Sequence, residues 1–171
     1  NALDTWSFLE GFALDGLFIV GLSVLGRGLL PGGAVVAAGV LLALRYGAEI
    51  ALSPLGGHMA ERWGAERLLV GLSLATAVAL VGFGTGWLWS CAAAIVVLRA
   101  LQLPLLPPIV AHRHLGPDRV RALAARSVWR DIGAGLGPMA AGLLLSAVPA
   151  AWVYGRAALS LAAAAVAVVY E

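Results

Sequence analysis

Charge is scarce in this sequence. Only 12% of the 171 residues are Asp, Glu, Lys or Arg, and lysine is missing, so that all 11 basic residues are arginine. A soluble domain carries roughly twice that share of charged residues. Hydrophobic residues make up 61% of the chain, and the mean hydropathy is +0.94. The sequence therefore predicts an integral membrane protein, and the lack of a strand-like alternation of polar and apolar residues favours one built of helices.

Signatures of enzymes are also missing. The serines of the apolar segments have no histidine beside them in the membrane, because His58, His112 and His114 lie in or near polar connections. This argues against a serine protease of the bilayer. The sequence has no glycine-rich nucleotide loop, no zinc signature and no carboxylates spaced for acid–base catalysis. The single Cys91 excludes an internal disulfide. We expect no enzymatic activity, cofactor, metal or nucleic-acid partner.

Six apolar segments are each long enough to cross a bilayer, which takes about 20 helical residues. The expected spans are about 6–25, 34–53, 68–84, 88–111, 122–148 and 152–170. Arginines gather in the connections 54–67 and 112–121, which places these connections in the cytoplasm, together with both termini. The arginine-only basic set and the abundance of Ala, Gly, Leu and Val suggest a GC-rich bacterial gene, and hence the inner membrane. The chain starts at Asn1 without Met, and we expect a fragment of a longer protein.

Ionisable side chains inside these spans are costly and are therefore candidate functional residues. Asp15 of the first span and Arg99 of the fourth are both expected near the middle of the bilayer, where opposite charges should pair. Arg45 and Glu49 lie one helical turn apart on the second span. The Asp15–Arg99 pair has two interpretations, which stay open: a static bridge that assembles the bundle, or a site that takes up a proton when Arg99 moves away.

Three prolines follow Arg99 in the fourth segment, at Pro104, Pro107 and Pro108. Each removes a backbone donor, so we expect this helix to be bent or broken. The sequence does not decide between a static kink and a flexing gate.

The connection between the second and third spans carries the first family resemblance. Gly57-x-Met59-Ala60-Glu61-Arg62-x-Gly64 resembles the loop between the second and third helices of major facilitator superfamily transporters, G-x-L-A-D-R-x-G-R-[RK]. Glu61 replaces the usual Asp, and Ala65-Glu66 replace two basic residues. We expect a polar hinge and gating loop that includes Gly57, Glu61, Arg62, Gly64 and Arg67. Gly64 suits a positive φ, and Glu61 should be held by an arginine or a helix N-terminus.

Two further motifs resemble the same family. Arg99-x-Leu101-Gln102 is similar to the R-x-L-Q-G motif of the fourth helix in proton-coupled members, with Leu103 in place of the final Gly. Gly137-Pro138-x-x-x-Gly142 is similar to the G-x-x-x-G-P-x-x-G signature of the fifth helix of antiporters, with its last Gly one residue late. Gly133-x-x-x-Gly137 should also let two helix backbones approach closely.

The resemblance implies one six-helix half of a twelve-helix secondary transporter that moves a small solute by alternating access. It favours the C-terminal half over the N-terminal one. The partner would be a second six-helix bundle, either the missing half of the chain or another copy. By analogy with the family, the first and fourth helices line the cavity with Asp15, Arg99, Gln102 and Phe12. The second and fifth helices border the partner, where an ion-pair network is expected from Arg45, Glu49, Arg130 and Asp131. A self-contained six-helix channel and a membrane scaffold are the alternatives.

Overall fold

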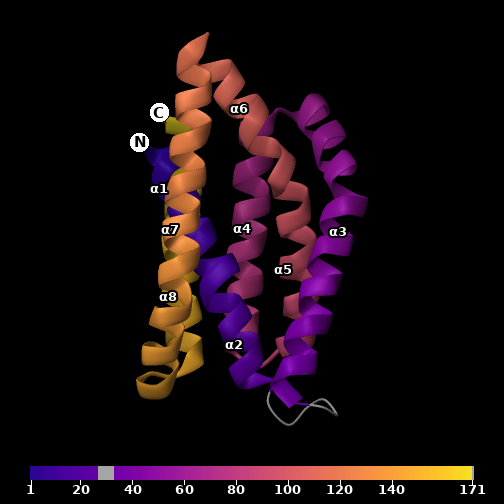
Figure 1. Cartoon of the computed structure of the whole chain (residues 1–171), viewed down its shortest axis with the longest axis vertical. Coiled ribbons are helices and arrows are strands. Elements are labelled where there is room, and N and C mark those ends of the chain that lie inside the picture. Colours follow the sequence, from indigo (N-terminus) through magenta and orange to yellow (C-terminus); the bar gives the residue numbers. More distant parts are fainter. Residues whose placement is uncertain (27–32, 171) are drawn as a thin grey trace.

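The computed structural model describes residues 1–26 and 33–170, and the described residues form helices joined by short turns, without a strand. The helices form six rods that run along the long axis of the molecule (Figure 1). Their elements are α1 (Ala2–Glu10), η1 (Gly11–Leu17), α2 (Phe18–Leu25), α3 (Gly33–Trp63), α4 (Ala65–Gly84), α5 (Leu88–Gln102), η2 (Leu103–Leu105), α6 (Leu106–Arg113), α7 (Pro117–Ala147) and α8 (Ala150–Tyr170).

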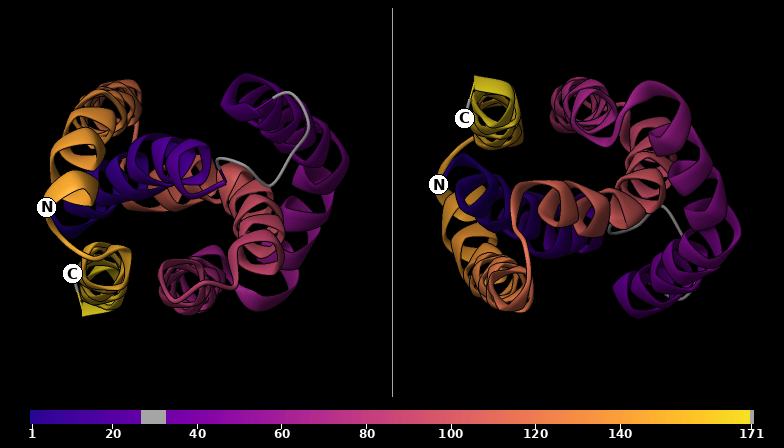
Figure 2. Two further views of the ribbon diagram at one scale, coloured as in Figure 1. Left: turned by 90° about the horizontal axis from the view of Figure 1, so that it is seen from below. Right: turned by 90° about the horizontal axis from the view of Figure 1, so that it is seen from above.

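Both marked ends of the chain lie at the upper end of the bundle in Figure 1, which we call the terminal end. The α3–α4 and α6–α7 turns lie at this end as well, and the α7–α8 turn lies at the opposite, far end. Seen along the long axis, α1, α7 and α8 form one side of the molecule and α3 with α4 and α5 the other (Figure 2). The rod of α1, η1 and α2 packs against α7 and α8 and also reaches α3.

Four rods are long and apolar enough to cross a membrane: Ala2–Leu25, Ala65–Gly84, Leu88–Arg113 and Ala150–Tyr170. They match the first, third, fourth and sixth predicted spans. The other two rods, α3 and α7, have 31 residues each, which corresponds to about 46 Å and exceeds the thickness of a bilayer. Large apolar side chains also cover the outside of the bundle, as at Val78 on α4, which is 73% exposed. Extensive exposed apolar surface is typical of proteins that contact lipid or a partner.

The predicted polar hinge at residues 56–67 is wrong in its extent. Helix α3 continues through Pro54 to Trp63, about ten residues beyond the predicted end, and α4 begins at Ala65. The turn is confined to Gly64, whose φ of 86° confirms the expected left-handed conformation. Packing explains the continuation: a Cβ on Gly56 would lie 2.5 Å from the carbonyl oxygen of Leu101 and 2.9 Å from Cγ of Pro104. This close contact with α5 and η2 holds α3 together where its proline has removed a hydrogen bond.

Other boundaries also differ from the predicted spans. The first rod begins at Ala2 rather than near residue 6, because the Asn1 side chain caps it by accepting a hydrogen bond from the Leu3 N–H at 2.9 Å. Helix α7 begins at Pro117 instead of 122, with proline in the first turn, where its missing N–H costs nothing. The predicted break in the fourth rod is confirmed, since η2 is a short 3₁₀ segment at Leu103–Leu105.

The first rod contains a π-helical segment, η1, which packs along α7. Glycines make this contact possible, and four on the two rods are in close approach: Gly11, Gly16, Gly133 and Gly137. A Cβ on Gly137 would lie 2.5 Å from Cα of Gly16 and 2.5 Å from the Phe12 carbonyl oxygen, and a Cβ on Gly133 would collide with the backbone of Phe8. This confirms the close approach predicted from Gly133-x-x-x-Gly137. Gly142 does not take part, because no described atom lies within 4 Å of its Cβ position. Pro138 contributes its Cδ to the same contact, 2.9 Å from the Cβ position of Gly16.

Candidate functional site: a buried charge cluster

Arg99 of α5 lies at the centre of the candidate site. One of its terminal nitrogens forms an ion pair with Oε1 of Glu10, and the other donates a hydrogen bond to Oδ2 of Asp15 at 2.8 Å. Its Nε lies 3.7 Å from Oε1 of Glu49. A single guanidinium thus joins carboxylates from three segments: α1, η1 and α3. The pairing of Asp15 with Arg99, which their depths in the sequence led us to expect, is present.

Arg45 of α3 supplies the second positive charge. Its terminal nitrogen lies 2.6 Å from Oδ1 of Asp15, and its Nε donates to Oε1 of Glu49 at 3.1 Å. Asp15 is therefore held between two arginines that come from different rods. The predicted pair of Arg45 and Glu49 exists, and it is part of the same site as Asp15 and Arg99. We call Glu10, Asp15, Arg45, Glu49 and Arg99 the charge cluster.

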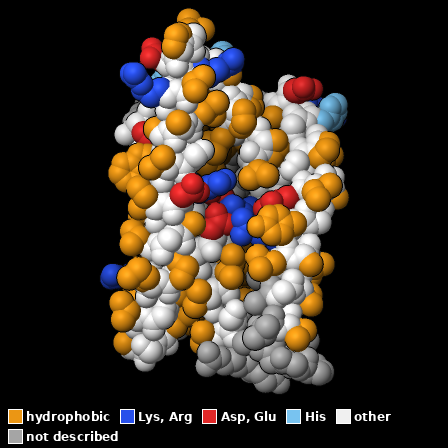
Figure 3. Space-filling view, viewed as in Figure 1, with side chains coloured by type: hydrophobic (Ala, Val, Ile, Leu, Met, Phe, Trp, Pro, Cys, Tyr) orange, Lys and Arg blue, Asp and Glu red, His pale blue; other side chains and the backbone are white. Residues whose placement is uncertain are grey.

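The charge cluster is almost removed from solvent. Side-chain exposures run from 4% at Arg99 to 16% at Arg45. Two arginines face three carboxylates, so the formal charge of the cluster is −1 when every group is ionised. Red and blue side chains gather in a hollow at mid-height between α7 and α3 (Figure 3). Charge at such a depth is costly unless it is compensated, and Arg130 of α7, which acts electrostatically on Glu10, contributes to the compensation.

The positions of these residues along their helices explain why they meet. Asp15 lies thirteen residues after Ala2 and Arg99 eleven residues after Leu88. At a rise of 1.5 Å per residue both are roughly 15–20 Å from either end of their rods. The two rods run antiparallel, so Asp15 and Arg99 lie at the same depth, and their hydrogen bond shows that the two side chains face each other. Asp15 also lies in the π-helical η1, and such segments frequently occur at functional sites.

Glu10 was missed by the sequence analysis. An isolated acid in the apolar stretch Trp6–Val20 was the available signal, since such residues are rarely placed there without a partner. Its spacing of five residues from Asp15 does not put both carboxylates on one face of an α-helix. A π-helical turn, with its i→i+5 bonding, brings residues five apart closer in direction. No sequence pattern indicates a π-helical segment at this place.

Two residues expected at the cavity lie elsewhere. Gln102 is buried and donates from its side-chain nitrogen to the Thr76 hydroxyl at 3.2 Å, which ties α5 to α4. Phe12 stacks on Phe8, with ring centroids 6.0 Å apart, and lines a separate cavity between η1, α7 and α8. The hydrogen bond of Gln102 and the ring contact of Phe12 are thus both made outside the charge cluster.

The four residues expected to form one ion-pair network are split between two places. Arg45 and Glu49 belong to the charge cluster, whereas Arg130 and Asp131 are neighbours on α7 whose charged atoms are 3.6 Å apart. Asp131 is exposed and Arg130 is partly exposed. The backbone of Arg130 lies against Gly11, close to the cluster. Arg130 also acts electrostatically on Glu10, so it borders the charge cluster, and the expected single network stays a prediction.

The gating-loop residues have a different environment from the expected one. Glu61 is 84% exposed, and its ion partner in the described part of the chain is His58, at 4.0 Å on the same helix. The prediction that an arginine or a helix N-terminus holds Glu61 is wrong, because Glu61 lies on the outer face of the last turns of α3. Gly57 and Arg62 lie on these turns as well, and Arg67 is exposed in the first turn of α4.

A different residue ties the terminal end together. Arg113, at the end of α6, lies 2.7 Å from Glu66 of α4 and donates to the Val168 carbonyl of α8 at 2.6 Å. It joins three rods beside the α3–α4 turn. Sequence reasoning had placed Arg113 only in a basic connection, since its partners are 47 and 55 residues away.

No group of three or more His, Cys, Asp or Glu side chains among residues 1–26 and 33–170 is placed to hold a metal ion. Comparison of the chain with protein-family models, with curated proteins and with solved structures gives no match. What the protein does must therefore be argued from the charge cluster and the helices around it.

Proposed function

We propose that the protein is one six-helix bundle of a secondary active transporter, which moves a small solute across a membrane by alternating access. The observation that carries the proposal is the charge cluster: five ionisable side chains at mid-height of long apolar rods, almost buried. Charged groups at such depth are expensive, and they typically mark ion or solute pathways. A scaffold gains nothing from them that apolar packing would not provide at lower cost.

The membrane placement follows from the same helices. Apolar rods of 20 to 26 residues suit the thickness of the hydrocarbon core. The terminal end carries five of the eleven arginines, at Arg62, Arg67, Arg113, Arg119 and Arg121. Because basic connections stay on the cytoplasmic side, the terminal end with both termini lies in the cytoplasm. The arginine-rich composition suits a bacterial inner membrane.

A second bundle is the proposed partner. Acidic and basic side chains gather in a hollow at mid-height on the face of the bundle seen in Figure 3. Polar side chains on a face at membrane depth need a covering surface. A second six-helix bundle, from the same chain or from another copy, would close the hollow and leave a cavity at the midplane for the solute.

Proton coupling is the proposed role of the cluster itself. Asp15 lies between Arg45 and Arg99, which belong to different rods. If α5 shifts at its 3₁₀ break, Arg99 separates from Glu10 and Asp15, and a carboxylate left without its cation favours proton uptake.

Asp15→Asn tests the proposal, because it keeps the shape of the side chain and removes its ionisation. The protein, expressed with its proposed partner bundle, would be reconstituted in liposomes and given a panel of radiolabelled small solutes under an imposed pH gradient. We expect Asp15→Asn to abolish accumulation while retaining exchange at equal concentrations. Asp118→Asn, which changes an exposed acid in the first turn of α7, far from the cluster, is the matched control and should behave as the unmodified protein. Accumulation by Asp15→Asn against a gradient would contradict the coupling role.

A further inference from the structure

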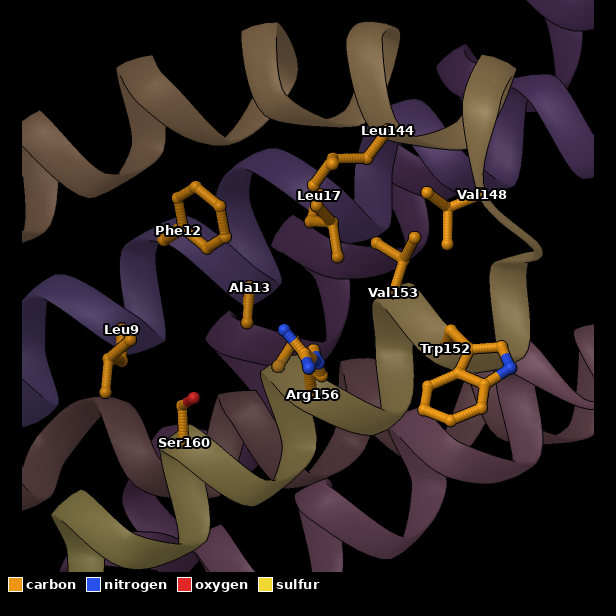
Figure 4. A pocket seen from close by; sticks show the side chains of 11 residues that line it. Leu9, Phe12, Ala13, Leu17, Leu144, Val148, Trp152, Val153, Arg156 and Ser160 are labelled. Carbon is orange, nitrogen blue, oxygen red and sulfur yellow. The ribbon is translucent and has the colours of Figure 1, made fainter.

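The cavity between the first rod, α7 and α8 is separate from the charge cluster and has a volume of about 470 Å³. Its floor is formed by residues of the first rod: Leu9, Phe12, Ala13 and Leu17. One wall comes from the end of α7, with Leu144 and Val148. The other wall comes from α8, with Trp152, Val153, Arg156, Ala157 and Ser160. In Figure 4, α7 passes on one side and α8 on the other, with the first rod between them. The volume lies within the usual range for small-molecule sites, roughly 300–1,000 Å³.

Arg156 is the one charged side chain that lines this cavity. It lies in the middle of the α8 wall, opposite Ala13 (Figure 4). Within the part of the chain that the structure describes, no carboxylate pairs with it: the ion pairs of that part involve the other arginines and one histidine. Arg156 is exposed, so it lies at the open edge of this cavity, where a guanidinium at membrane depth favours an anionic counterpart. The ligand should therefore carry a negative charge beside an apolar body.

The length of the cavity indicates which amphiphile fits. It runs along α8 from Trp152 to Ser160, eight residues and thus about 12 Å. Half of a hydrocarbon core of about 30 Å is about 15 Å, the depth of one leaflet. Trp152 lies next to the far end of α8 and is exposed, as is typical of an aromatic residue at the membrane interface. The cavity thus runs from the far interface to the region of the midplane.

We propose that this cavity is a phospholipid site, with the lipid phosphate on Arg156 and one acyl chain along Val153, Ala13 and Leu9. The Arg156 side chain is long enough to turn its guanidinium toward the far interface while its stem stays in the cavity. Arginine binds phosphate oxygens with paired hydrogen bonds. This inference rests on the proposed membrane placement and is independent of solute transport, because the lipid lies on the side of the first rod that faces α8.

A photoreactive phosphatidylglycerol tests the proposal. The probe carries a diazirine at the end of one acyl chain and is added in limiting amount to the purified protein in detergent micelles. After illumination, digestion and mass spectrometry locate the labelled residues. We expect adducts at Leu9, Ala13 and Ser160, the deep end of the cavity. Labels spread evenly over the exposed faces of α4 and α8 would overturn the proposal.

Two pairs of variants separate the phosphate contact from the apolar cavity. Arg156→Gln should lower labelling about tenfold, the usual consequence of losing a charge-assisted hydrogen bond, whereas Arg156→Lys should keep most of it. Ala157→Phe fills the cavity and leaves the charge in place, and it should also reduce labelling. Its control is Ala163→Phe, an exposed alanine on another face of α8, which should label as the unmodified protein does. Equal labelling of Arg156→Gln and the unmodified protein contradicts a phosphate site.

Competition identifies the anionic group. Excess unlabelled phosphatidylglycerol should displace the probe, and phosphatidylcholine, which carries the same phosphate, should displace it as well. Displacement by dodecanoate but by neither phospholipid would show a site for amphiphilic carboxylates and overturn the lipid proposal. Melting curves of all variants in the same detergent show whether each is folded, so that a loss of labelling is read only from folded protein.

Discussion

Replacing Arg99 by glutamine removes one of the two positive charges in the charge cluster. Glu10, Asp15 and Glu49 then face Arg45 alone, and the formal charge changes from −1 to −2. Glu10→Gln has the opposite effect, since it leaves two arginines and two carboxylates and a formal charge of zero. The double variant has one arginine and two carboxylates and returns to −1. The formal charge of the cluster thus predicts an order of stability among the three variants that the number of lost ion pairs alone would not predict.

The magnitude follows from burial. Removing one partner of a buried ion pair typically costs 3–5 kcal/mol, because the remaining charges lose their compensation. Arg99 is 4% exposed, so Arg99→Gln should fall in that range, about 3–5 kcal/mol, and lower the melting temperature by about 10 °C. Glu10→Gln removes a charge from a cluster that has one carboxylate in excess, and its cost should stay below about 1 kcal/mol. The double variant should recover about half of the loss, as expected when two changes share one network.

Thermal unfolding of the four proteins in one detergent at neutral pH measures these differences. Acidification adds a second check, because protons can replace the missing cation: Arg99→Gln should gain stability relative to the unmodified protein as the pH falls toward 5. If Glu10→Gln is as unstable as Arg99→Gln, or if the double variant is no better than Arg99→Gln, the charge-balance argument is refuted.

Three further predictions concern packing and backbone. Gly137→Leu should destabilise the protein by about 1–3 kcal/mol or more, because its Cβ would collide with the first rod. The control Gly142→Leu has open space around it and should melt as the unmodified protein does. Equal melting curves for the two variants would contradict the contact. Gly64→Val should lower the free energy of unfolding by about 1–3 kcal/mol, because Gly64 has a positive φ. Gly57→Val, in the helical part of the same region, should not have this effect. Limited proteolysis at the turn compares the two variants. Tyr154→Phe removes a hydroxyl that donates to the Leu17 carbonyl at 2.9 Å and should cost about 1 kcal/mol in thermal unfolding.

Properties that depend on neighbouring residues could be read from the sequence. The four apolar rods follow from runs of hydrophobic residues, since a bilayer-length helix must bury its backbone polar groups internally. The turn at Gly64 follows from the one residue type that adopts a positive φ without strain. The break at Leu103–Leu105 follows from the prolines around it, and the approach of α7 to the first rod follows from the spacing of Gly133 and Gly137.

The composition of the site depended on the tertiary structure. Depth along two helices predicted that Asp15 and Arg99 would meet, but depth does not give direction, and the π-helical turn that brings Glu10 into the same cluster has no signature in the sequence. Arg45 and Glu49 form a pair that the sequence shows, and only the packing of α3 against α5 brings them to Asp15. Helix α3 passes Pro54 because its contact at Gly56 compensates for a lost hydrogen bond. The sequence by itself determined which apolar segments form helices, because hydropathy and backbone preference are local. The folded chain decided where α3 ends and which charges share one site, because ion pairs across 84 and 89 residues depend on how the rods are rotated and packed.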